Sequence, residues 1–363
     1  MYQYPFGLIK SARFALSGIG AKMRRRHATT AADWFRNAYG RALADEIAIP
    51  LTEAWSGVPA TDLSPAMGNK LGPGIHHSLF LQLASRVTRR AVSNGYSQEM
   101  PEMPNVYHGY PDGGVARLLE PLAMELGDSV QVESPVENIL VEDDAVTAVN
   151  IKGREVEVSA VISSAPVHVL PKLVRGTSAP EHLAAFRYRP MIFVNLRFEG
   201  RGLLPDTVLW IPDRKLPFFR LTETPISMPW LAPEGKTLVT VDIGCEVGDP
   251  YWSMPEDQLT ALCLDGLSEI FPDIRRKFLG GARILKTPVA YPVYLLRYEQ
   301  ERLRFAASTG VEGLYSLGRN GEFSHLLMED VYWRTLKKTA GIAAWVKGLP
   351  ESASSAVSAA SLV

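Results

Sequence analysis

The sequence has little or nothing of several features that mark whole classes of protein. Its two cysteines, Cys245 and Cys263, lie in no CxxC pair or Cys/His cluster, so neither a disulfide framework nor a structural zinc site is expected. We interpret both as small buried hydrophobic residues, with a reducing cytosol as the default compartment. The 38 basic and 39 acidic residues nearly cancel, and this balance gives no indication of nucleic-acid binding. No run of about 18 apolar residues occurs, so no membrane-spanning helix is predicted.

Acidic residues are also missing from the start of the chain. None precedes Asp33, whereas six basic residues do: Lys10, Arg13, Lys22, Arg24, Arg25 and Arg26. Acid-poor, arginine-rich starts occur in transit peptides, and basic amphipathic helices also lie on membrane surfaces. A solvated helix is the simplest interpretation. Targeting and peripheral contact with a membrane are the alternatives.

What is present is ordinary globular sequence, with 46% apolar residues. A chain of 363 residues exceeds the roughly 250–300 residues at which single cores stop growing, so we expect two domains or one with a large insertion. Apolar periodicity predicts a helix from Leu8 to Arg26, and Thr29 or Thr30 suits the N-cap of a second helix. Prolines make residues 49–73 a predicted loop-rich stretch, and residues 76–91 again show a helical pattern.

The pattern changes at the turn Pro111-Asp112-Gly113-Gly114, which opens a helix with apolar residues at helical spacing. β-Branched residues then predict a meander with tight turns at Asp143-Asp144 and at Lys152-Gly153. The strands expected here cover residues 130–132, 136–141, 145–151, 155–158 and 160–166. The last of these is apolar on both faces, which is typical of a strand inside a parallel sheet.

The rest of the chain predicts a second sheet and a closing strand–helix pair. Residues 192–198 and 237–243 are expected to be strands of a separate mixed sheet, and residues 256–271 an amphipathic helix. A strand over 314–317 and a helix from about 329 to 345 follow. The tail after Pro350 is low in bulky residues and is predicted to be disordered.

The strongest local signal is Gly318-Arg319-Asn320-Gly321-Glu322-Phe323, between this strand and this helix. Glycine at the end of a strand lets a ligand approach the backbone closely. The helix that follows would direct its free N–H groups and positive dipole end at that ligand. On spacing alone, a plain strand–turn–helix is the simpler interpretation.

Several short strings gain weight from their order along the chain. They are Tyr110-Pro111-x-Gly-Gly, Ser134-Pro135-Val136-x-x-Ile139, Val161-Ile162-Ser163-Ser164-Ala165-Pro166, Ala290-Tyr291-Pro292-Val293-Tyr294 and Leu314-Tyr315-Ser316-Leu317-Gly318-Arg319-x-Gly321-x-Phe323. Over about residues 2–348 this order resembles the superfamily of flavin-containing amine oxidases and protoporphyrinogen oxidases. The last two strings are most similar to the branch that includes UDP-galactopyranose mutases.

The resemblance implies an α/β (α+β) fold with an incomplete Rossmann-like FAD-binding domain, an inserted β-meander and a mixed helical and β-sheet substrate lobe. The implied segments are the helical part of the substrate lobe (1–105), the middle of the FAD-binding domain (106–172), the sheet of the substrate lobe (173–305), the end of the FAD-binding domain (306–348) and a disordered tail (349–363).

The resemblance also implies FAD-binding roles for single residues. The backbone of Val136 would pair with the adenine, and Gly318 with Arg319 would approach the ribityl and phosphate part. The N–H of Met328 would face the isoalloxazine ring. No catalytic residue and no metal ligand is identified.

The substrate would be a small molecule. Tyr291 and Tyr294 would lie near the boundary between the lobes and line the substrate site. Arg220 and Arg297 are cations that suit an acidic substrate.

The sequence departs from the family pattern at three places. His325 stands where the pattern has Tyr, and Leu327 where it has Asn or Asp. The family's opening strand, GxGxxG turn and helix have no counterpart. The nearest string, Gly18-Ile19-Gly20-Ala21-Lys22-Met23, lacks the third glycine, and we interpret it as a coincidence inside a helix.

Three explanations for the missing glycine turn stay open. The gene is split or its start misassigned, the chain is a natural truncation that no longer binds FAD, or a partner chain supplies the FAD-binding unit. Without that unit the strands at Val161 and Leu314 would present an exposed parallel edge, which favours a missing partner or a misassigned start.

The expected function is a cytoplasmic FAD-dependent oxidoreductase that oxidises a C–N or C–C bond of a small organic substrate. A non-catalytic binding protein derived from such an enzyme and a flavin-dependent nucleotide-sugar mutase are the alternatives.

Overall fold

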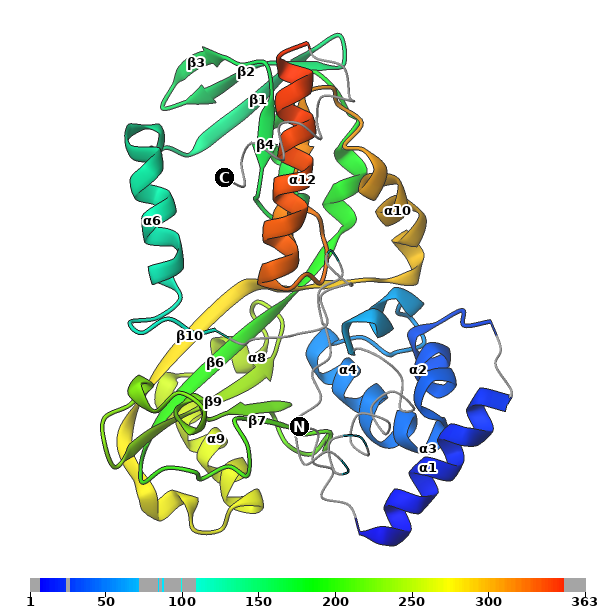
Figure 1. Cartoon of the computed structure of the whole chain (residues 1–363), viewed down its shortest axis with the longest axis vertical. Helices are drawn as coiled ribbons and strands as arrows, with labels where there is room; N and C mark the ends of the chain where they lie inside the picture. The colour runs from blue at the N-terminus through cyan, green and yellow to red at the C-terminus, as the bar shows by residue number, and fades with distance from the viewer. Residues whose placement is uncertain are drawn as a thin grey trace. The chain divides into compact units, whose positions relative to one another are not determined.

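The structure is a computed structural model that describes residues 7–23, 27–71, 84, 87, 99 and 109–348. The chain divides into two compact units (Figure 1). Unit 1 comprises Met1–Val92 and Tyr188–Leu296, and unit 2 comprises Ser93–Arg187 and Arg297–Val363. The tail predicted to be disordered and almost all of the helix predicted over residues 76–91 lie outside the described residues.

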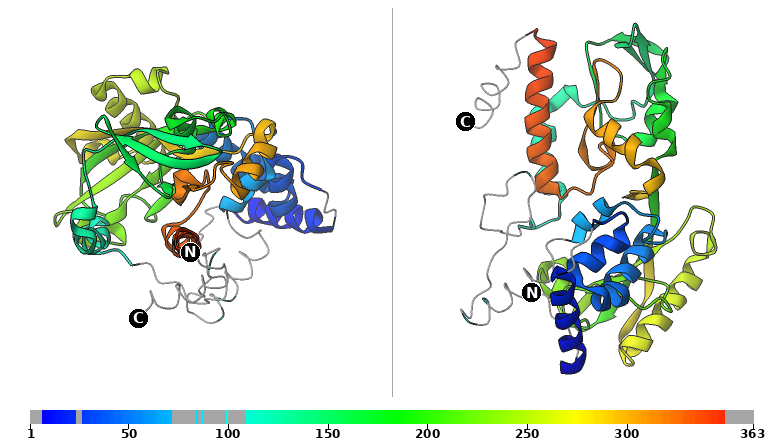
Figure 2. Two further views of the ribbon diagram at one scale, coloured as in Figure 1. Left: turned by 90° about the horizontal axis from the view of Figure 1, so that it is seen from above. Right: turned by 90° about the vertical axis from the view of Figure 1, so that its right-hand side faces the viewer.

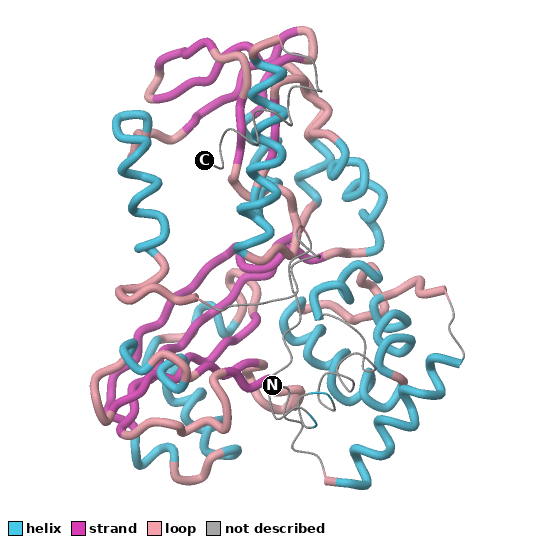
Figure 3. The backbone as a smooth tube through the Cα atoms, in the orientation of Figure 1, coloured by secondary structure: helices cyan, strands magenta, loops and turns pink. Residues whose placement is uncertain are grey.

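The first segment of unit 1 is mainly helical (Figure 3). Its helices are α1 (Leu8–Met23), α2 (Ala31–Tyr39), α3 (Arg41–Leu43) and α4 (Ile49–Ser56), with a π-helical turn over Ala44–Ala48. The Thr30 hydroxyl accepts a hydrogen bond from the Asp33 N–H, and the Asp33 carboxylate accepts one from the Thr30 N–H, both at 3.1 Å. This capping box fixes the start of α2 and confirms the predicted second helix.

Two details of this helical segment bear on the sequence predictions. The Gly18-Ile19-Gly20 string lies inside α1, as expected. The prediction of a loop-rich stretch from residue 49 was wrong over α4. Pro50 stands at the start of this helix, directly after the π-helical turn over Ala44–Ala48, where its fixed φ suits the helix.

The second segment of unit 1 forms a five-stranded sheet in the order β10-β6-β9-β8-β7. The strands are β6 (Arg187–Glu199), β7 (Val208–Trp210), β8 (Arg220–Thr222), β9 (Lys236–Gly244) and β10 (Phe278–Val293). β6 pairs antiparallel with β9 from Met191↔Gly244 to Glu199↔Lys236. From Ile192 to Glu199 alternate residues of β6 are buried, which is the period-two pattern of a strand with one face on a core, whereas residues 188–192 are all buried.

Helix α9 (Glu256–Ile270) packs on this sheet and contributes Leu259, Cys263 and Leu267 to the core. A single-turn helix, α8 (Pro250–Ser253), precedes it. Cys245 and Cys263 are both buried and unbridged, which confirms their interpretation as small core residues.

Unit 2 contains the predicted meander as a four-stranded sheet in the order β3-β2-β1-β5. Its strands are β1 (Val136–Glu142), β2 (Ala145–Ile151), β3 (Arg154–Glu157) and β5 (Val174–Arg175). Asp143 and Asp144 have φ of 49° and 62°, and Lys152 and Gly153 have 53° and 70°. Two successive positive φ values define the tight hairpin turns that the sequence predicted.

A second sheet of unit 2 pairs β4 (Val161–Ser163) in parallel with β11 (Leu314–Ser316), in register Leu314↔Val161. The parallel pairing was predicted from the two apolar faces of residues 160–166. The strand expected at Val130–Val132 was wrong, because these residues form a turn with both valine side chains exposed.

The helices of unit 2 are α6 (Ala116–Leu126), α7 (Leu170–Leu173), α10 (Glu299–Ala307), α11 (Gly318–Gly321) and α12 (Met328–Val346). Helix α12, seen along its length in the right-hand view of Figure 2, contacts β11 where the rings of Tyr315 and Trp345 lie 6.1 Å apart in an edge contact. Its bounds agree with the predicted closing helix to within one residue at each end. Helix α6 buries none of its residues.

Candidate functional site

The turn between β11 and α12 is held against the end of β4. The Leu317 N–H donates to the Ser163 carbonyl at 2.9 Å, and the Ser316 hydroxyl donates to the Gly321 carbonyl at 2.8 Å. Gly321 is buried, and a Cβ there would lie 3.0 Å from the Ser163 oxygen. The second glycine of the turn therefore serves close packing of the turn on β4.

Gly318 differs from Gly321 in both backbone conformation and surroundings. Its φ is +81°, in the left-handed region that favours glycine, and a Cβ built on it meets no atom within 4 Å. The backbone at the end of β11 is therefore open to approach by a ligand. This geometry is what the strand–glycine–helix signal in the sequence predicted.

Phe323 anchors the same turn from the inside. Its φ is +50°, which is unfavourable for an aromatic residue, yet its side chain is only 1% exposed. The ring lies 4.7 Å from that of Phe186 and 6.1 Å from that of Tyr298, centroid to centroid. Phe305 completes the cluster through an edge contact with Phe186. Burial in this aromatic cluster holds the turn in a strained backbone conformation.

The N-terminus of α12 follows this turn. Its N-cap, Leu327, provides no side-chain hydrogen bond to the first-turn N–H groups, and Met328 is exposed. These N–H groups form the positive end of the helix dipole. A guanidinium N–H of Arg319 donates to the Leu326 carbonyl at 2.8 Å, so this side chain ties the turn to the start of α12.

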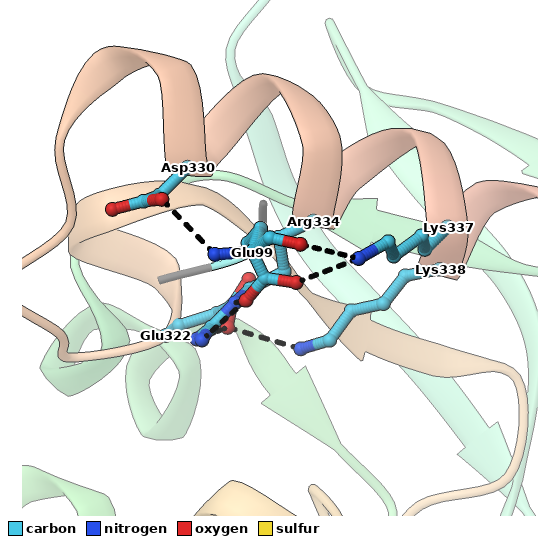
Figure 4. A network of polar contacts seen from close by, with 6 residues as sticks. All are labelled: Glu99, Glu322, Asp330, Arg334, Lys337 and Lys338. Atoms are coloured by element: carbon cyan, nitrogen blue, oxygen red, sulfur yellow. Dashed lines mark hydrogen bonds and ion pairs between the residues drawn. The ribbon is translucent and has the colours of Figure 1, made fainter. Parts of the chain in front are cut away.

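Acidic and basic side chains fasten α12 to its surroundings within unit 2 (Figure 4). Arg334 and Lys338 both contact one oxygen of Glu322 at 3.0 Å. Arg334 also contacts Glu99 at 2.9 Å, and Lys337 contacts Glu99 at 3.3 Å. The network fixes the direction in which α12 leaves the turn.

The network also shifts the pKa values of Glu99 and Arg334. Burial opposes ionisation of Glu99, but hydrogen bonds and charges from Arg334 and Lys337 outweigh it, so the pKa of Glu99 lies below its ordinary value. Burial likewise opposes the charge on Arg334, yet its hydrogen bonds to Glu322 and Glu99 raise the pKa of Arg334. Glu99 and Arg334 are therefore both charged at neutral pH.

A cavity of about 1040 Å³ lies within unit 2 between α12, β11 and the end of α10. Its walls include Tyr315, Phe323 and Trp345, and Arg334 and Lys338 line it on the α12 side. Burial, with a smaller contribution from the Glu312 carboxylate, raises the pKa of Tyr315. Gly318, Arg319 and Met328 are not among the residues that line this cavity, so it is distinct from the turn described above.

The other predicted flavin residue, Val136, lies in a different part of unit 2. It begins β1 and pairs with Ile151 of β2, and its side chain is exposed. Gly318, Arg319 and Met328 thus share one turn and helix start, whereas Val136 belongs to the meander sheet. The two sheets meet where the Val146 N–H donates to the Glu312 carbonyl at 2.9 Å.

Three of the predicted substrate residues, Tyr291, Tyr294 and Arg220, lie in unit 1. Tyr291 is on β10, with its ring 5.5 Å from that of Trp55 in an edge contact. Tyr294 follows β10 and is buried, and its carbonyl accepts a hydrogen bond from the Ser64 N–H at 2.7 Å. Arg297 begins the second segment of unit 2.

Arg220 carries a charge that is already compensated. On β8 it faces Asp242 of β9, with which it forms an ion pair, and its guanidinium lies 5.3 Å from the centre of the Trp210 ring. Burial raises the pKa of Asp242, and the Arg220 charge acts in the opposite direction.

Sequence reasoning missed Phe323 as an anchor and the charge network of α12. One signal for the network was available, since Arg334 and Lys338 are four residues apart on one helix face. Like charges at this spacing repel each other within the helix, and an acidic partner on a neighbouring element would offset that repulsion. No signal identified Glu99 or Glu322 as that partner, because the contacts join residues far apart in sequence.

The described residues contain no group of three or more His, Cys, Asp or Glu side chains placed to hold a metal ion. No described helix combines the length and the apolar character needed to cross a bilayer.

Residues 9–331, which make up most of the chain, match the family of flavin containing amine oxidoreductases. The chain belongs to this family. The resemblance predicted from the ordered sequence motifs is therefore confirmed, and the strand–Gly318–helix turn is part of a flavoenzyme fold.

Solved structures of this flavoenzyme fold are similar over most of the chain. A reduced UDP-galactopyranose mutase has a TM-score of 0.73 at 15% identity, covering 97% of this chain and 77% of the mutase chain. A putrescine oxidase bound to putrescine has a TM-score of 0.60 at 13% identity, covering 95% and 77%. An oxidoreductase from Methanosarcina mazei has a TM-score of 0.56 at 15% identity, covering 87% and 68%. The α/β fold class predicted from sequence agrees with these likenesses.

Proposed function

We propose that this member of the family is an FAD-dependent oxidoreductase that oxidises a C–N or C–C bond of a small organic substrate. The observation that carries the proposal is the turn at Gly318, where an open glycine backbone stands next to the uncapped N-terminus of the 19-residue helix α12. Family membership supports a flavin at this position. The choice of FAD, the bond class and the substrate are our inference.

The residues present suit the flavin end of FAD. Gly318 leaves room for a ligand at the backbone, and the N–H of Met328 is placed to donate to a flavin carbonyl at the positive end of α12. Arg319 acts as a positioning residue, because it links the turn to Leu326. The backbone of Val136 would hold the adenine. FAD, when bound, accepts the hydride that leaves the substrate.

The substrate side of the proposal rests on unit 1. Tyr291 and Tyr294 would line an apolar substrate cavity. The positive charge of Arg220 is already balanced by Asp242, so it gives little attraction to an acidic substrate. A neutral or cationic substrate therefore suits the site better than an acidic one. No general base is assigned, because hydride transfer to a flavin does not require one.

The pyrophosphate of FAD needs a further unit, since the sequence holds no GxGxxG turn. We propose that a unit with this turn, carried by a partner chain or by sequence outside these 363 residues, packs beside β4. Val161 and Ser163 direct their peptide groups to β11, so the peptide N–H and C=O of Ile162 point to the other edge of β4. The Ile162 side chain is also half exposed, which is unusual for parallel sheets, whose faces are normally covered.

The first experiment is the visible spectrum of the protein after incubation with FAD alone, or with FAD plus a separately expressed strand–GxGxxG–helix unit, and removal of unbound FAD by gel filtration. A flavin spectrum in either mixture is the expected result, and its appearance only with the added unit would support the split arrangement. A chain that stays colourless in both mixtures overturns the flavin proposal and favours a non-catalytic binding protein.

A matched pair of variants tests the turn itself. Gly318→Val places a branched side chain in the ligand space and strains the backbone, and should abolish flavin uptake. Gly200→Val is the control, because Gly200 has a similar φ of +86° and equally open surroundings but lies in unit 1. Equal loss of flavin in both variants would mean that only backbone strain was measured.

A second candidate function is a flavin-dependent nucleotide-sugar mutase. It is favoured by the similarity in fold to UDP-galactopyranose mutase. The flavin-loaded protein, reduced with dithionite, would be incubated with UDP-galactopyranose. Formation of a ring-contracted product, detected by chromatography, would replace the oxidoreductase proposal.

A further inference from the structure

Helix α1 presents two opposite faces of different character. Phe14 and Gly18 are buried against the body of unit 1, where Phe14 packs with Leu43. The opposite face is an apolar stripe at spacings of three and four residues, formed by Ile9, Ala12, Leu16, Ile19 and Met23. We call these five residues the α1 stripe.

The α1 stripe is exposed along its whole length. Ile9 is 90% exposed, Leu16 70%, Ile19 55% and Met23 83%. Single exposed apolar residues are common, but a continuous stripe on one helix face marks an interaction surface. Figure 1 shows α1 beside α2 and α3, with which it makes its contacts.

The inner face of α1 is fastened to unit 1 by specific contacts. The Ser17 hydroxyl accepts a hydrogen bond from the Ala42 N–H at 3.0 Å. Lys10 and Arg13 both form ion pairs with Glu46, the first at 3.2 Å. Because these contacts set the rotation of α1 about its axis, the stripe faces away from unit 1 as a fixed feature.

The charge of this segment selects the kind of surface that the stripe fits. Helix α1 has no acidic residue, and the first 32 residues of the chain hold six basic residues and no acidic one. Two copies of α1 packed stripe to stripe would bring two segments of net positive charge together, because Glu46 balances only one of the basic residues. An anionic phospholipid surface instead attracts the basic residues while its acyl region takes up the apolar side chains.

We propose that the α1 stripe docks this protein on an anionic membrane surface, with the helix lying in the plane of the interface. The proposal concerns peripheral binding and is independent of the flavin site. Isoleucine, leucine and methionine of the stripe enter the headgroup–acyl boundary. Lys10 and Arg13 share the single Glu46 carboxylate, so the pairs leave a net positive charge on α1 that attracts anionic headgroups.

The test is flotation of the full-length protein with vesicles of phosphatidylcholine alone and with 30% phosphatidylglycerol (about one anionic lipid in three). We expect binding to the anionic vesicles that weakens as salt rises, and little binding to the neutral ones. Leu16→Glu should reduce binding by about tenfold or more, because it removes apolar surface and adds a charge in the stripe.

A matched control separates insertion from simple attraction. Ser11→Glu adds the same charge to an exposed position of α1 that lies off the stripe, and should reduce binding by no more than about threefold. Leu16 is exposed, so circular dichroism of both variants should match that of the wild type. Equal losses in the two variants would overturn insertion of the stripe.

Two further results would overturn the proposal. One is failure of the wild-type protein to bind anionic vesicles at low salt. The other is a stable dimer by light scattering that Leu16→Glu separates into monomers, which would assign the α1 stripe to a second copy of the chain.

Discussion

The aromatic anchor at Phe323 gives a sharp test of the turn geometry. The φ of Phe323 is +50°, which strains its backbone. Its ring is buried, which stabilises the fold through packing. Phe323→Ala removes the ring but keeps a Cβ in the left-handed conformation. Phe323→Gly removes the ring and also relieves the backbone.

The expected energies follow from these two effects. Loss of a buried phenyl ring costs about 3–5 kcal/mol in either variant. The left-handed conformation costs a residue with a Cβ about 1–2 kcal/mol, whereas glycine costs about 0.5–1 kcal/mol through its freedom in the unfolded chain. Phe323→Gly should therefore be about 0.5–1 kcal/mol more stable than Phe323→Ala.

Phe186 is the matched control, because it belongs to the same cluster but has a φ of −72°. There the order should reverse, with Phe186→Gly about 0.5–1 kcal/mol less stable than Phe186→Ala. Urea unfolding midpoints of the four variants, compared at equal slope, measure both differences. If glycine is the less stable residue at position 323 as well, the strain argument is refuted.

Three further predictions concern other parts of the chain. The pKa of Glu99 is lower in the folded state than its unfolded value near 4.5, so ionised Glu99 stabilises the fold above that value. This stabilisation is lost as pH falls through the folded pKa. The free energies of unfolding of wild type and Glu99→Gln should therefore differ near neutral pH and converge in acid. Asp242→Ala leaves the mostly buried Arg220 charge without its partner and should cost about 3 kcal/mol in urea unfolding, whereas the double variant Asp242→Leu/Arg220→Met should recover most of this loss. Burial raises the pKa of Cys245 to about 11 and of Cys263 to about 12, so Ellman's reagent at pH 8 should find no fast thiol in the native protein and two in guanidinium; one fast native thiol would contradict this burial.

Local patterns carried most of the secondary-structure predictions. The meander was predictable because Asp143-Asp144 and Lys152-Gly153 suit the two-residue turns that its strands require. Helix α2 was predictable from the N-cap at Thr30. Helix α4 was missed because Pro50 was read as a breaker, although proline is tolerated in the first turn of a helix.

The sequence by itself determined the family, the order of the elements and the turn at Gly318, because these depend on residues close together in the chain. Only the tertiary structure decided that Glu99 and Glu322 hold α12, that Asp242 neutralises Arg220 and that the apolar stripe of α1 faces outward. These facts depend on contacts between residues far apart in sequence. No local pattern encodes such contacts, since they exist only once the backbone has brought the partners within a few ångströms.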